Sequence, residues 1–457
     1  MQTTKSVRDF SLVIALVVIC AFFAIVSPRF LSARNLSLLT TELSITATLA
    51  MGMLLVILPG NIDLSAGSGV GLLGGIASVL VFEHNWPAPL AMGAALLTGI
   101  FIWFCMGNLI VRQRIPAFII TLGGLLIFKG LFWLVIHNST IPIVQGGRAN
   151  LYSVLTTFYL PPVAGYALAT LIVVALVLAK LRARKALQAY GFAVEDGEVL
   201  FLKLFLAAQV IFLFVIVTNK FRGIPLSAGI LGVIAFAVYV LTAHTPFGRY
   251  LYAIGGNEEA AVISGVPVEK VVVGSFTIMG AIVAIAGFMQ TSYSGASTTT
   301  VGDLMELDAI AACVIGGVGL RGGRGTVLGV LFGALIMACL LNGMTLLAVS
   351  PEFKFIARGT VLSLAVWMDV RLGRRLFAAA ARIRNTGILP VSSNGHPARS
   401  GTSRLGILHD PSASPRRIRP VADWKPKLLH GLRLSGCASV LKIILSKSNV
   451  RGGAKSR

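Results

Sequence analysis

The stretch FGRYLYAIGGNEEAAVISGVPVEK, residues 247–270, is a polar, amphipathic interruption between two long apolar segments. Asn257 can cap a short helix, and Glu258 then lies in the first turn, where the helix dipole favours an acidic side chain. Gly265 can end this helix, and Pro267 prevents its continuation. A structured polar loop between apolar segments predicts a membrane protein that presents the loop to a partner.

The expected helix carries small residues on neighbouring faces, at Ala260, Ala261 and Ser264. A small-residue helix at the membrane surface suits docking into a cleft of another protein. The alternative, which the spacing alone leaves equally open, is an ordinary surface turn followed by a helix.

The composition excludes a soluble globular class. The chain is 56% hydrophobic and 12% charged, with a mean hydropathy of +0.86. It is therefore predicted to be an all-α, polytopic integral membrane protein with about 10–12 transmembrane helices, including short broken or re-entrant ones. The expected spans cover residues 10–27, 43–58, 67–83, 88–111, 115–136, 163–180, 200–218, 225–243, 271–290, 304–319, 326–347 and 353–370.

The distribution of basic residues orients these spans. Most Lys and Arg between spans fall on one side of a twelve-crossing arrangement, which the positive-inside rule places in the cytoplasm. Both termini and the 247–270 loop are then expected to be cytoplasmic.

The chain divides at about residue 371. Residues 1–370 are expected to form the membrane domain, and residues 371–457 a basic, disordered C-terminal extension that holds most of the net charge of +22. Its basic side chains could bind anionic lipid, but it lacks the interleaved aromatic residues of a nucleic-acid platform. Our hypothesis is that it is a read-through extension without function.

A polar, Gly-rich segment interrupts the apolar pattern at residues 59–68. Non-helical backbone at membrane depth persists only where protein or a water-filled cavity satisfies it. Asn61, Asp63 and Ser65 could line or brace a polar pathway, with Gly67 beside them. Asp63 could instead cap the next helix at a turn near the surface, and a structural role of the motif is favoured.

A second such segment covers residues 302–317. Glu306 and Asp308 open a short helix of small residues, where they could serve as caps or border a translocation path. Gly316 and Gly317 would permit close helix approach.

Signals for catalysis are absent from the sequence. No phosphate-binding Gly-rich loop ends in Lys, and no cluster of Cys and His suggests a metal site, so neither catalytic nor metal-binding residues are expected. ATP-driven transport would need a separate ATPase subunit. The alternative is an ion-coupled secondary transporter or channel, for which charged residues such as Lys129 are the candidates.

Three segments resemble signature segments of sugar ABC importer permeases, the family of ribose and related monosaccharides. They are NIDLSAGS at 61–68, IGGNEEAAVISG at 254–265 and ELDAIAACVIGG at 306–317. The resemblance runs in order over about residues 10–370, and FRGIP at 221–225 is most similar to the xylose-type permeases.

The resemblance implies a dimeric permease in the bacterial plasma (inner) membrane. Its partners would be two cytoplasmic ATPases, which bind ATP and Mg, and a periplasmic sugar-binding protein; this chain would bind no cofactor. The path for the sugar, or its structural support, would include Asn61, Asp63, Ser65, Gly67, Glu306, Asp308, Gly316 and Gly317. The coupling segment that docks on the ATPase would include Gly255, Gly256, Asn257, Glu258, Ala260, Ala261, Ser264 and Gly265.

Overall fold

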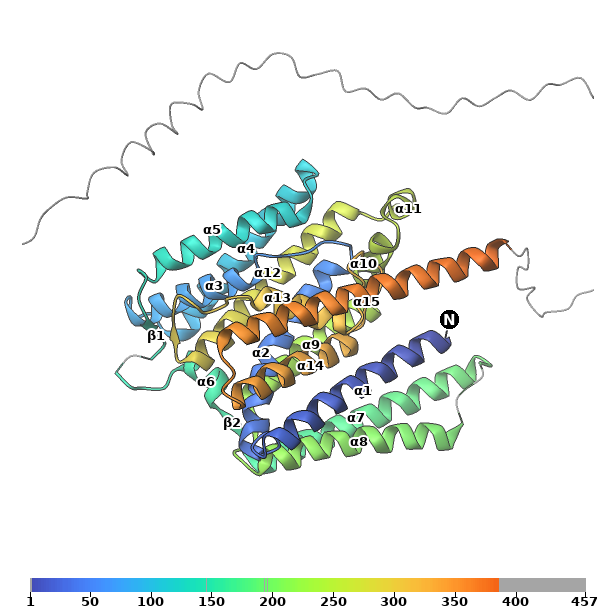
Figure 1. Cartoon of the computed structure of the whole chain (residues 1–457), viewed down its shortest axis with the longest axis horizontal. Coiled ribbons are helices and arrows are strands. Elements are labelled where there is room, and N and C mark those ends of the chain that lie inside the picture. The colour runs from blue at the N-terminus through green and yellow to red at the C-terminus, as the bar shows by residue number, and fades with distance from the viewer. Residues whose placement is uncertain (1, 145, 193, 195, 386–457) are drawn as a thin grey trace, which may run out of the picture. The chain divides into compact units, whose positions relative to one another are not determined.

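Helices form wherever the sequence is continuously apolar, because a helix satisfies its backbone polar groups within one segment. The computed structural model (Figure 1) describes residues 2–144, 146–192, 194 and 196–385. The longer helices are α1 (Gln2–Val26), α2 (Ala33–Ile57), α3 (Ala66–Phe82), α4 (Ala88–Gln113), α5 (Ala117–Val135), α7 (Pro162–Ala189), α8 (Gly197–Asn219), α9 (Leu226–His244), α12 (Val268–Ser294), α14 (Val327–Leu346) and α15 (Pro351–Asn385).

The prediction of an all-α polytopic membrane protein is confirmed. Eight described helices are long and apolar enough to cross a membrane: α2, α4, α5, α7, α8, α9, α12 and α14. Shorter apolar helices cover Leu12–Val26 and Ala66–Phe82. The predicted segment 304–319 contains α13 (Met305–Ile315), whose length of about 16 Å is too short for a hydrocarbon core of about 30 Å.

Two boundaries differ from the expectation. Helix α2 begins ten residues before the predicted residue 43, because its polar first turns bond inside the protein: Asn35 donates to Asn342 of α14 at 2.9 Å. Helix α15 continues beyond residue 370 to Asn385, so the predicted basic extension begins as helix. The rest of that extension, residues 386–457, lies outside the described residues.

Helix α12 lies at the centre of the helical arrangement, packed against α2, α3 and α4. In contrast, α7 and α8 pair with each other and bury little of their surface (Figure 1). The core therefore sits around α2, α3 and α12, next to both polar segments singled out in the sequence.

Glycines allow this close packing. A Cβ at Gly99 of α4 would lie 2.9 Å from the carbonyl oxygen of Gly280 on α12, and a Cβ at Gly74 of α3 would lie 2.9 Å from that of Gly287. Backbone meets backbone at both crossings, as small residues permit in membrane helix pairs.

Two short antiparallel strand pairs tie loops together. In the first, β1 (Ile141–Pro142) pairs with β4 (Ala296–Ser297), with Ile141 opposite Ser297. In the second, β2 (Tyr159–Leu160) pairs with β3 (Ile224–Pro225). The β1–β4 pair holds the chain after α5 beside the chain after α12. The short helix α6 (Leu151–Thr157) follows β1 and begins in a capping box at Asn150.

The 247–270 interruption folds into two short helices, α10 (Pro246–Gly256) and α11 (Glu258–Ile263). The predicted helix and its cap are confirmed in α11, where the Asn257 side-chain oxygen accepts a hydrogen bond from the Ala260 amide at 2.9 Å. Gly265 has a φ of +78°, as a helix stop requires. Helix α10 was not predicted.

The crossing of α4 and α12 can be tested with two glycines of α4. Gly99→Ala forces a methyl group against the Gly280 carbonyl, and we expect the free energy of unfolding to fall by about 1–3 kcal/mol. Gly93→Ala is the matched control, because no atom lies within 4 Å of its Cβ position. Thermal unfolding of the purified protein in detergent measures both, and equal stability of the two variants would contradict the close crossing.

Candidate functional site

Asp63 organises the break between α2 and α3. Its Oδ1 accepts hydrogen bonds from the Ser65 amide at 2.8 Å and the Ser65 hydroxyl at 2.6 Å. Its Oδ2 accepts a hydrogen bond from Trp103 Nε1 of α4 at 2.6 Å. All three residues are fully buried within the protein, and the N-cap position of α3 is Ser65 and not Asp63. It fixes the turn and ties it to α4, while Asn61 lies half-buried at the start of the turn.

The two polar segments meet at the beginning of α3. A Cβ at Gly67 would collide with the carboxylate of Glu306 and would lie 2.6 Å from the Gly302 carbonyl oxygen. Glu306 is 4% exposed. Gly67 therefore provides the space in which Glu306 and the backbone before α13 approach α3.

Asp308 does not cap α13, although it lies in its first turn. Its Oδ2 pairs with Arg358 Nη2 of α15 at 3.1 Å, and the Asp308 side chain is 7% exposed. Asp308 Oδ1 and Arg358 Nε are buried without hydrogen-bond partners. This role of Arg358 was not predicted, although a charge within an apolar segment is a signal for a buried acidic partner.

Gly316 and Gly317 serve different purposes at the end of α13. A Cβ at Gly316 would lie 2.7 Å from the Val330 amide nitrogen of α14, so Gly316 allows contact between the two backbones. Gly317 has a φ of +82°, and its amide donates to the Val314 carbonyl at 2.9 Å. It ends the helix in the left-handed region that glycine adopts at little cost.

The exposed surface of α11 differs from the expectation in one residue. Ala261 was expected to offer a small contact to a partner, but it is 4% exposed and packs inward. Glu258, Ala260 and Ser264 are exposed, as expected of a docking surface. The apolar part of this surface was not predicted: Ile263 is 87% exposed.

The end of α10 contacts the loops that follow α2 and α13. The Gly323 amide, in the loop after α13, donates to the Leu58 carbonyl at the end of α2 at 2.9 Å. Gly255 of α10 lies against both: a Cβ there would lie 2.8 Å from the carbonyl carbon of Gly322 and would collide with the Leu58 carbonyl oxygen. We call Leu58, Gly255, Gly322 and Gly323 the glycine junction.

A side-chain bond supports the glycine junction. Tyr252 of α10 donates its hydroxyl to the Gly325 carbonyl at 2.9 Å. Burial raises the pKa of Tyr252, so its hydroxyl stays protonated and remains a donor. By contrast, Gly256 has no atom within 4 Å of its Cβ position. The polar interruption thus contacts the loops at both breaks through one side of α10.

Residues 35–366 match the model of a protein family described as the branched-chain amino acid transport system/permease component. The chain belongs to this permease family. No solved structure matches the chain.

Individual relatives are similar over most of their length. The xylose transport system permease protein XylH of Haemophilus influenzae is 39% identical over 365 residues, which are 80% of this chain and 96% of that protein. The XylH protein of Escherichia coli is 37% identical over 81% of this chain and 93% of its own. The ribose import permease protein RbsC of E. coli is 31% identical over 78% of this chain and 92% of its own.

The Asp63 turn gives a stability prediction. Asp63→Ala removes the acceptor for Ser65 and Trp103, and each buried donor left unsatisfied costs about 1–3 kcal/mol. We expect a lower unfolding temperature in detergent and impaired transport.

Trp103→Phe provides the control, because it removes the indole donor. In the double variant Asp63→Ala/Trp103→Phe the two losses of stability should be less than additive, since no indole N–H remains unpaired. Additive losses would show that the Asp63–Trp103 bond contributes nothing to the turn.

Proposed function

We propose that this chain is the membrane-spanning permease subunit of an ATP-dependent importer of a monosaccharide, with D-xylose as the cargo. The observation that carries this proposal is the 37–39% identity to two xylose permeases over 93–96% of their length. The family description names amino acid transport, so the choice of sugar rests on these relatives. The matched region ends at residue 366, which supports assigning residues 371–457 to a separate extension.

The importer would be completed by other subunits. A cytoplasmic ATPase would bind ATP and Mg, and a periplasmic binding protein would deliver the sugar to the permease in the bacterial inner membrane. Two copies of this chain would form a homodimer in contact with membrane lipid. In the orientation that the basic residues favour, both termini and the α10–α11 segment face the cytoplasm.

The α10–α11 segment is the proposed docking element for the ATPase. Its exposed surface combines acidic side chains with Ile263, and a largely exposed apolar side chain of this kind suits burial in a partner's cleft. Its other side touches the glycine junction, next to both breaks. Movement of α10 by the ATPase would therefore displace the loops after α2 and α13 together.

The ion-coupled alternative finds no support in these relatives, which are named as a xylose transport system permease and a ribose import permease. Two of the charged candidates also form ion pairs: Lys129 pairs with Asp303, and Asp308 with Arg358. A carboxylate that carries protons would need to change its charge, which these ion pairs oppose.

Reconstitution into proteoliposomes tests the proposed function. With the ATPase inside and the binding protein outside, ATP and Mg should drive uptake of labelled D-xylose. Vesicles without the ATPase are the control and should take up none. Uptake driven by an ion gradient alone would overturn the proposal, and ATP-driven uptake of leucine in place of sugar would reassign the cargo.

Two neighbouring glycines test the coupling role of α10. Gly255→Ala should push α10 away from Leu58, Gly322 and Gly323, whereas Gly256→Ala meets no atom within 4 Å. We expect Gly255→Ala to lower sugar-stimulated ATP hydrolysis by about fivefold or more, which is the scale of a lost coupling free energy of about 1–3 kcal/mol. Gly256→Ala should stay near wild type. If ATPase co-purification is retained and both variants hydrolyse ATP alike, the glycine junction does not carry the coupling.

A further inference from the structure

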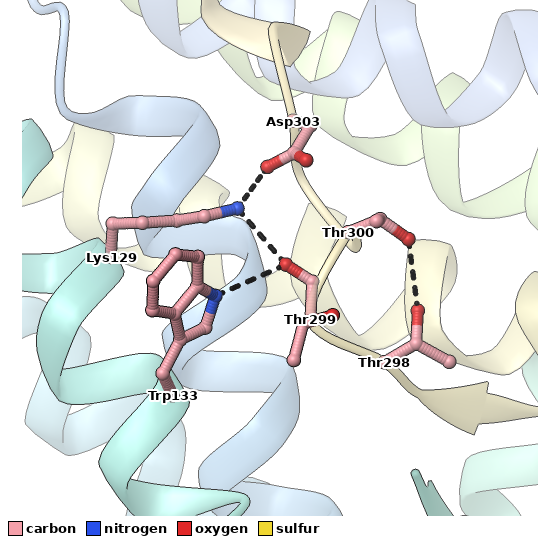
Figure 2. Close-up of polar contacts among 6 residues, drawn as sticks. All are labelled: Lys129, Trp133, Thr298, Thr299, Thr300 and Asp303. Atoms are coloured by element: carbon pink, nitrogen blue, oxygen red, sulfur yellow. Dashed lines mark hydrogen bonds and ion pairs between the residues drawn. The ribbon is translucent and has the colours of Figure 1, made fainter. Parts of the chain in front are cut away.

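A polar cluster joins α5 to the chain after α12 (Figure 2). Lys129 of α5 forms an ion pair with Asp303 and donates to the Thr299 carbonyl at 3.0 Å. Trp133, one turn further along α5, donates its indole N–H to the same carbonyl at 3.3 Å. The Lys129 ammonium lies 5.5 Å from the centre of the Trp133 ring.

The cluster lies at the surface of the described chain. The Asp303 side chain is 48% exposed, and Trp133 is 43% exposed. Beside them, the hydroxyls of Thr298 and Thr300 form a hydrogen bond of 3.2 Å (Figure 2). Carboxylate, ring face and hydroxyls are therefore accessible together.

The charges of the cluster make lipid an unfavourable neighbour. Lys129 lies six residues before Val135, or about 9 Å from that end of a membrane-spanning helix. Its partner Asp303 is a half-exposed carboxylate in the loop between β4 and α13, and such a charge beside a membrane-spanning helix is costly against hydrocarbon, so it faces protein or water. This edge of α5 therefore faces water or another protein.

The chemistry of the cluster suits a neutral, polyhydroxylated ligand. The Lys129 charge balances that of Asp303, so the cluster has no net charge with which to attract an ion. The exposed carboxylate can accept hydroxyl hydrogens, and charge-assisted bonds of this kind are the stronger ones. The flat ring of Trp133 can pack against the C–H face of a sugar while its N–H stays bonded.

We propose that Lys129, Trp133 and Asp303 form a sugar-contacting subsite on the translocation path, near the outer end of α5. Asp303 accepts hydrogen bonds from the sugar hydroxyls, Trp133 packs against the sugar ring, and Lys129 holds Asp303 in place. The subsite rests on the proposed function, because it takes the same cargo in the same permease.

The test measures ATP-driven D-xylose uptake by the complete importer in proteoliposomes. Trp133→Leu removes the ring face, and we expect uptake at low sugar concentration to fall by roughly tenfold, while Trp133→Phe retains most of it. Trp86→Leu is the matched control, since Trp86 is 45% exposed in the loop after α3 and lies on the same side of the membrane in the proposed orientation.

A paired substitution separates the subsite from a structural ion pair. Lys129→Met/Asp303→Leu removes both charges together, so neither charge is left unpaired. If the pair is only structural, uptake by this variant should stay near the wild-type rate. The subsite predicts that uptake stays low, because the hydroxyl acceptor is gone, while ATPase co-purification and basal ATP hydrolysis are unchanged.

Three results would overturn the subsite in an importer whose wild type takes up xylose. The first is wild-type uptake by the paired variant, and the second is equal uptake by Trp133→Leu and Trp86→Leu. The third is dissociation of dimers caused by Trp133→Leu, because it would show that Trp133 lies in a contact between two copies of the chain. Absence of ATP-driven xylose uptake in the wild type would instead refute the proposed function itself.

Discussion

Backbone that leaves the helical pattern inside a membrane must find its hydrogen-bond partners within the protein, and the rest of this structure depends on that constraint. At the break between α2 and α3, the buried Asp63 carboxylate accepts from Ser65 and from Trp103 of α4. One side chain thus closes the turn and attaches it to a neighbouring helix. The bond to the fully buried Trp103 requires that Asp63 be buried too, which explains why an acidic residue occupies a position with no exposure.

Glycine residues are the second requirement, because they let the ends of the interrupted helices come close to other backbone. Gly67 admits Glu306 and the Gly302 carbonyl, and Gly255 admits the loops after α2 and α13. These contacts connect three segments that are far apart in sequence. A side chain at Gly67 would separate α3 from the backbone before α13, and one at Gly255 would separate α10, which faces the ATPase in the proposed importer, from the loops after α2 and α13.

Local signals in the sequence were sufficient for much of the fold. Continuous apolar runs predicted the helices, and the Asn257 cap and the Gly265 stop of α11 followed from residue type and spacing. Contacts between distant segments were not predictable in this way. The sequence shows that Arg358 lies in an apolar segment, but the choice of Asp308 as its partner depends on how α15 packs against α13. The inward direction of Ala261 likewise depends on where α11 sits.

The distribution of charge indicates how such a protein could move a neutral solute. Within the described residues, the ion pairs Lys129–Asp303 and Asp308–Arg358 balance charge locally and are poorly suited to carry protons or ions. The energy for uphill transport must then enter from outside the membrane core. The α10–α11 segment offers a route, because one surface is exposed with Ile263 outermost while the other touches both breaks through Gly255. Mechanical input at that segment, with the charges of these two pairs balanced locally, is an arrangement that suits an ATP-driven importer of uncharged sugars.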